Sequence, residues 1–297
     1  VLVLCITFNC ATLWPYADIA NVPKRERGSL TSYVSTIEKN LISSGYQTPG
    51  AEDVALVKIV ASELLTAIAS GAIGEFRSAS YHASSLQYEI VKYADVDHGK
   101  SHYILRERQN SKRGYGVFIF SSLQSSRALI EVPHPQTDLY TGSLGIRIYA
   151  DSNARAFLMA SARMDAGAGA DVSHDSPSFF EAVHEVLVSN DSIVIQVHGF
   201  SRTVHPGYPD LVISSGTATM IGQVQELGGV FSASGFSVGI FDGYQWSDLS
   251  GTQNVQGRNV NLVGGVFIHI ELELSMRTEN AELTVNILSS FVIAQSA

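Results

Sequence analysis

Two histidines follow directly on apolar segments of the chain. His134 comes after residues 128–132, and His198 ends the apolar run 192–197 and is followed by Gly199. Continuous apolar runs of this length are typical of strands that are buried on both faces. Ligands of open α/β sheets bind beyond the carboxyl ends of such strands, and imidazole is a common ligand of zinc. We therefore expect His134 and His198 to share a metal site.

A third ligand is expected to be a carboxylate, because both cysteines of the chain, Cys5 and Cys10, lie within the first ten residues. Asp138 follows His134 by four residues and reaches the same point if the loop turns. Glu131 precedes His134 by three residues and is the alternative. We predict His134, Asp138 and His198 as the metal ligands, with Glu131 as the substitute for Asp138.

Residues 267–277 alternate apolar and polar side chains. With the side-chain period of two that a strand imposes, His269, Glu271 and Glu273 share one face. An ordinary amphipathic strand explains this pattern as well. Carboxylates beside an imidazole are nevertheless the groups that general-base catalysis needs, and Glu271 is the predicted base.

Other polar residues are candidates for substrate binding. Arg163 follows an apolar segment, and its planar guanidinium suits a substrate carboxylate. The polar, glycine-bounded segment 251–258 contributes Asn254, Gln256 and Arg258, and Glu273 is a further candidate. The alternative for this segment is an ordinary surface turn.

The elements that position these residues predict an α/β fold. An amphipathic helix is expected over 52–69 and helices over 179–187 and 283–293, while strand patterns recur at 88–93, 103–106, 116–120, 128–132, 157–160, 192–197, 211–214 and 266–274. Residues 146–149 fit either a strand or a helix. The alternation indicates a mixed, largely parallel sheet with helices on both faces. We expect an N-terminal extension over residues 1–85 and the metal-site domain over residues 86–297.

Composition excludes several classes of protein. The chain has 297 residues, a net charge of −9 and only 19 Lys and Arg residues, which argues against binding to nucleic acid. No segment provides the roughly 20 apolar residues of a membrane span. The apolar run 1–8 fits either a remnant of an export signal or an ordered strand. We accordingly expect a secreted or periplasmic protein, with a cytoplasmic location and self-assembly as further possibilities.

The order of these motifs resembles the zinc carboxypeptidase-like hydrolases, which include aspartoacylase-type deacylases, N-formylglutamate amidohydrolases and phage poly-γ-glutamate hydrolases. The resemblance covers about residues 128–277. It lies in His134 with Asp138, then His198, then Glu271, 73 residues after His198. The family's usual His-x-x-Glu is replaced here by His134-x-x-x-Asp138. The resemblance implies a late-strand glutamate as base and an arginine between the histidine motifs, here Arg163, as a substrate clamp.

These observations predict a zinc-dependent hydrolase of an amide or peptide-like bond in a small molecule or peptide. Bound zinc would lower the pKa of a water molecule toward about 7, and Glu271 would take its proton. Arg163 or Arg258 would stabilise the oxyanion. The alternative is a non-catalytic, exported structural or binding protein that keeps the fold. One equivalent of tightly held zinc favours the enzyme, and no zinc favours the alternative.

Overall fold

One ten-stranded sheet runs through the residues that the computed structural model describes, which are 22–123 and 126–295. Its strand order is β1-β2-β3-β4-β6-β5-β7-β10-β8-β9. The strands are β1 (Lys24–Gly28), β2 (Tyr88–Asp95), β3 (Lys100–Glu107), β4 (Val117–Ser121), β5 (Ala128–Val132), β6 (Ala156–Met159), β7 (Ile193–Phe200), β8 (Leu211–Ser214), β9 (Val238–Ile240) and β10 (Val266–Glu273). The central strands β6, β5, β7 and β10 are mutually parallel, whereas β2, β3 and β4 pair antiparallel.

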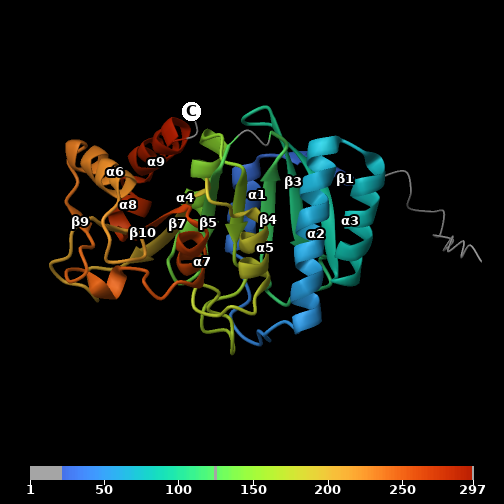
Figure 1. Ribbon diagram of the computed structural model, residues 1–297, viewed down its shortest axis with the longest axis horizontal. Helices are drawn as coiled ribbons and strands as arrows, with labels where there is room; N and C mark the ends of the chain where they lie inside the picture. The colour runs from blue at the N-terminus through green and yellow to red at the C-terminus, as the bar shows by residue number, and fades with distance from the viewer. Residues whose placement is uncertain (1–21, 124–125, 296–297) are drawn as a thin grey trace, which may run out of the picture.

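Helices cover both faces of this sheet (Figure 1). They are α1 (Leu30–Glu38), α2 (Ala51–Ser70), α3 (Ile73–Ser85), α4 (Thr141–Asp151), α5 (Phe179–Leu187), α6 (Gly222–Ala233), α7 (Val255–Val263), α8 (Leu274–Arg277) and α9 (Ala281–Gln295). Helices α1, α4, α6 and α9 pack with one apolar cluster, and α2, α3, α5 and α7 pack with the other. The predicted fold class, a mixed α/β sheet with helices on both faces, is confirmed.

The strand alternation sends the polar residues of the central strands toward one helix layer. In β5, β7 and β10 the apolar residues Ile130, Val197 and Ile270 belong to the cluster under α4 and α9. The intervening positions, which include Gln196 and Glu271, therefore point toward α5 and α7. A buried polar layer forms where that face meets the carboxyl ends of the parallel strands.

Local differences from the sequence expectations have physical causes. Residues 146–149, which the pattern left open between strand and helix, belong to α4. The segment 251–258 is a loop only to Asn254, because α7 begins at Val255. The parallel edge strand β1 was not predicted, since its residues are mostly charged.

The apolar N-terminal run and the possibility of a membrane span were also considered in the sequence. The apolar run 1–8 lies outside the described residues, so the choice between export signal and strand stays a prediction. Within residues 22–123 and 126–295, no helix is both long and apolar enough to cross a membrane.

Candidate metal and active site

Strand register places the polar residues of the central strands in adjacent rows. Glu271 on β10 lies opposite His198 on β7, and His269 lies opposite Gln196. Glu131 on β5 lies on the other side of Gln196. Because neighbouring strands are only about 4.8 Å apart, these side chains lie side by side on one face of the sheet.

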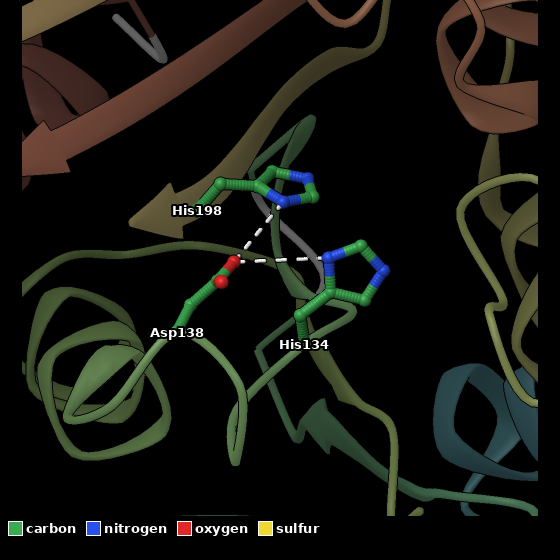
Figure 2. A group of neighbouring side chains, drawn as sticks. All are labelled: His134, Asp138 and His198. Carbon is green, nitrogen blue, oxygen red and sulfur yellow. Dashed lines mark ion pairs between the residues drawn. The ribbon is translucent and has the colours of Figure 1, made fainter. Parts of the chain in front are cut away.

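The loop after β5 adds His134 and Asp138 to the site. The backbone N–H of Asp138 donates to the carbonyl of His134 at 2.8 Å, so one helical turn places both side chains on the same side. Asp138 Oδ2 lies 3.7 Å from His134 Nδ1 and 3.3 Å from His198 Nδ1 (Figure 2). The three predicted ligands thus converge, with one donor atom from each lying within 4.8 Å of the others.

The Nε2 atoms of the two histidines, which point away from Asp138, have hydrogen-bonding partners. His134 Nε2 lies 2.8 Å from Asp171 Oδ1 and 3.1 Å from Ser173 Oγ. His198 Nε2 lies 3.0 Å from Gln196 Oε1. Both rings therefore direct Nδ1 toward Asp138. Two imidazole nitrogens and one carboxylate oxygen, with a fourth position open, are a donor set of catalytic zinc sites, so the residues present fit zinc.

Electrostatics within the group favour a charged Asp138 and shift the pKa values of the two histidines in opposite directions. Burial opposes protonation of His134, but the nearby carboxylates of Asp138 and Asp171 prevail and raise its pKa to about 9. Burial also acts against a charged Asp138, yet His134 and His198 hold the pKa of that carboxyl well below its usual range. Burial lowers the pKa of His198, although Asp138 opposes this shift.

Glu271 lies beside this group and shares His198 with it. His198, His269 and Glu271 form a second set of mutually close donor atoms, and His269 Nε2 is 3.7 Å from Glu271 Oε1. Burial, reinforced by the charge of Asp138, raises the pKa of Glu271 well above its usual value. Burial lowers the pKa of His269 well below its usual value. Glu271 therefore has the elevated proton affinity of a general base.

These residues open into a pocket of about 260 Å³. Its lining includes His134, Asp138, His198, His269 and Glu271 from the site, Met164, Ser173 and His174 from the loop after β6, and residues 247–254 as the facing wall. A larger cavity of about 540 Å³ lies between α1 and the β3–β4 turn and contains none of the predicted site residues.

Among the predicted substrate-binding residues, only Asn254 lines this pocket. Arg163 forms an ion pair with Asp165 at 2.7 Å, and Arg258 donates to Gln253. Glu273 accepts a hydrogen bond from Ser275 at the start of α8. Gln256 is completely buried beneath the site. The structure thus brings His134, Asp138, His198 and Glu271 together. It leaves Arg163, Gln256, Arg258 and Glu273 outside the pocket lining.

Glu131, the alternative carboxylate ligand, forms hydrogen bonds with other buried residues instead. Its Oε1 lies 2.6 Å from His184 Nδ1, with both side chains fully buried, and its Oε2 accepts from Gln196 at 3.1 Å. His184 has its pKa raised, because the charge of Glu131 overcomes the opposing effect of burial. The geometry therefore favours Asp138 as the carboxylate ligand.

A buried arginine joins the two segments that carry the predicted ligands. Arg277 of α8 donates through Nη1 to the carbonyl of Leu139 and through Nη2 to that of Phe200. Leu139 follows Asp138, and Phe200 ends β7. Gly199 leaves room for this guanidinium, since an added Cβ there would lie 2.3 Å from Arg277 Cζ.

Three solved structures resemble this chain at low sequence identity. A zinc-free apo form of YndL is 14% identical, with a TM-score of 0.43, covering 62% of this chain and 92% of that one. The N-formylglutamate amidohydrolase of Ralstonia eutropha JMP134 is 10% identical, with a TM-score of 0.44 and coverages of 62% and 97%. A putative carboxypeptidase A from Shewanella denitrificans OS-217 is 10% identical, with a TM-score of 0.35 and coverages of 72% and 66%.

The resemblance to this group is confirmed as a distant one. No family model and no curated protein matches the sequence.

Several residues of the site received no role from sequence reasoning. Asp171 and Ser173 were not among the predicted site residues, and His269 was predicted only as a member of a polar face. Gln196 was absorbed into an apolar strand, although a lone amide two residues before His198 must share its face. That spacing was the signal that could have found it.

Glu181 provides a test of the buried layer through pH. Burial raises its pKa to about 7 against the opposing charge of His184, and its ordinary value is 4.5. The folded chain thus binds this proton more tightly than the unfolded chain. The protonated Glu181 therefore stabilises the fold, and this stabilisation is fully present below about pH 4.5. It is lost as pH rises through about 7, which lowers the free energy of unfolding by about 3 kcal/mol.

We therefore expect Glu181→Gln to flatten the decline in the free energy of unfolding between about pH 5 and 8. Glutamine keeps an acceptor for Gln256, which donates to Glu181 Oε2 at 2.7 Å. Urea titrations of both proteins across this range measure the difference. Parallel curves for the two proteins would contradict the assignment.

Proposed function

We propose that this chain is a zinc-dependent hydrolase of an amide or peptide-like bond. The observation that carries the proposal is the convergence of His134 Nδ1, His198 Nδ1 and an Asp138 oxygen beside Glu271. Each ligand ring is held through its other nitrogen, as is usual for metal-binding histidines. A pocket lined by a glutamate of raised proton affinity is a better fit to catalysis than to a purely structural site.

The chain's own residues supply the proton transfers. A zinc ion in this donor set provides Lewis-acid polarisation and a water molecule that is acidic near neutral pH. Glu271 accepts the proton of the attacking water as the water oxygen bonds to the carbonyl carbon of the substrate. The same carboxyl then gives that proton to the amine as the carbon–nitrogen bond breaks. Asp171 and Gln196 keep the two imidazoles in place throughout.

The pocket lining suggests which substrates are favoured. Among the described residues that line it, none is Lys or Arg, and the facing wall offers Ser247, Thr252, Gln253 and Asp248. A clamp by Arg163 requires that residue to leave Asp165. We therefore propose neutral N-acyl amides or peptides, in preference to substrates with several carboxylates.

The proposal is tested on purified protein. We expect about one equivalent of zinc after dialysis, and hydrolysis that chelation abolishes and zinc restores. Neutral N-formyl and N-acetyl amino acid amides should be cleaved faster than the corresponding acidic N-acyl amino acids. The alternative, an exported structural or binding protein without catalysis, predicts no tightly held zinc and no hydrolysis of either series.

A further inference from the structure

Gln196 is a completely buried amide in the middle of β7, two residues before His198. Its Nε2 donates to Glu131 and to Gln256, both at 3.1 Å. Its Oε1 accepts from Asn254 at 2.5 Å and lies 3.0 Å from His198 Nε2. All four hydrogen-bonding positions of the amide are thus occupied.

A backbone carbonyl, which can only accept hydrogen bonds, fixes which end of the Gln196 amide faces His198. Gln256 lies 2.8 Å from the backbone carbonyl of Val172, and a carbonyl only accepts hydrogen bonds. The nitrogen of Gln256 must therefore face Val172, which leaves its oxygen facing Gln196. That oxygen in turn requires the nitrogen of Gln196, so the oxygen of Gln196 faces His198.

The buried pair of Glu131 and His184 supports the same orientation. A reversed Gln196 would place its oxygen against a carboxylate oxygen of Glu131 and against the oxygen of Gln256. Two buried hydrogen bonds would be lost, and two pairs of acceptors would face each other. Unsatisfied buried polar groups cost about 1–3 kcal/mol each, so the reversed orientation is strongly disfavoured.

We infer that Gln196, oriented by Gln256 and Val172, is a positioning residue that keeps the proton of His198 on Nε2 and the lone pair of Nδ1 toward Asp138. The inference rests on the proposed function for its purpose, because Nδ1 is the nitrogen that would bind zinc. Asp138 lies 3.3 Å from the same Nδ1 and competes for the proton in the metal-free protein. Gln196 favours the proton on Nε2 instead, because its oxygen faces that nitrogen. Glu131 supports this by accepting from the nitrogen of Gln196.

The first measurement concerns the metal-free wild-type protein. Long-range ¹⁵N–¹H spectra of histidine-labelled protein distinguish the two tautomers, and His198→Ala identifies the resonances. We expect the Nε2–H form of His198. A dominant Nδ1–H form would overturn the inference, whether or not the protein hydrolyses amides.

The second measurement compares zinc affinities by chelator competition. Gln196→Met and Gln256→Met should weaken binding about 10–100-fold, as loss of an outer-shell partner typically does. Asn261→Met removes an amide from the same helix as Gln256, where Asn261 only bonds the Ser215 carbonyl, and should leave affinity unchanged.

The outcomes separate the two proposals. Wild-type zinc affinity in both Gln196→Met and Gln256→Met would overturn the positioning role. Absence of zinc binding in the wild-type protein would refute the proposed function, and the tautomer measurement would still decide the inference.

Discussion

Replacement of Glu271 by Gln should lower the rate of amide hydrolysis by about 10²–10⁴-fold, the usual contribution of a general base. Gln has the size and reach of Glu but cannot accept the proton of the attacking water. Glu271 lies in the pocket beside His198 and His269, and it is not needed to complete the His134, Asp138 and His198 set. Zinc content should therefore remain near one equivalent. Steady-state kinetics and metal analysis of the same preparation measure both quantities.

Glu273→Gln is the matched control for this experiment. Glu273 lies two residues along β10, but it accepts hydrogen bonds from Ser275 and does not line the pocket. Its replacement should leave the rate within a factor of about two of the wild type, since surface changes are usually small in effect. Loss of activity in Glu273→Gln with full activity in Glu271→Gln would show that the base is assigned to the wrong glutamate.

His198→Ala should remove the metal itself. His198 contributes one of three donor atoms, and its loss also leaves Gln196 Oε1 and Asp138 without one of their partners. We expect zinc affinity to fall by more than the roughly 10–100-fold that an outer-shell change produces, and hydrolysis to fall to background. Chelator competition and metal analysis after dialysis provide the measurement.

His205→Ala is the appropriate comparison for this variant. His205 also follows β7, but it pairs with Asp248 at 3.1 Å and belongs to neither group of close donor atoms. Its zinc content should equal that of the wild type. Retention of a full equivalent of zinc by His198→Ala would exclude His198 as a ligand.

The sequence predicted those parts of the molecule that depend on local pattern. Apolar runs of strand length located β5 and β7, and alternating apolar and polar residues located β10. The histidines at or just beyond the ends of β5 and β7 followed from these elements. Spacing placed Asp138 near His134, and one helical turn brings them together. The period of two put His269 and Glu271 on one face.

Partners that are distant in sequence were beyond such patterns. Arg163 was predicted as a substrate clamp from its position after an apolar strand, yet the adjacent Asp165 engages it at the surface. Gln256 was predicted to bind substrate because its segment is polar. The start of α7 at Val255 instead turns Gln256 inward toward Gln196 and Glu181. Register between β5 and β7, which sets the contact of Glu131 with Gln196, is a property of the whole sheet.

The contact of Arg277 with Leu139 and Phe200 has a consequence for the proposed zinc site. Because this guanidinium ties the loop of Asp138 to the strand of His198, the separation of the donor atoms is set when the chain folds. The entropy of assembling the ligands is then lost before any ion arrives, and little remains to be lost on binding. A rigid cage of this kind discriminates among ions by size and preferred geometry, because it cannot contract or expand to suit each one. In the proposed zinc site, the small space beside Gly199, which a single methyl group would fill, would thus bear on which metal is selected.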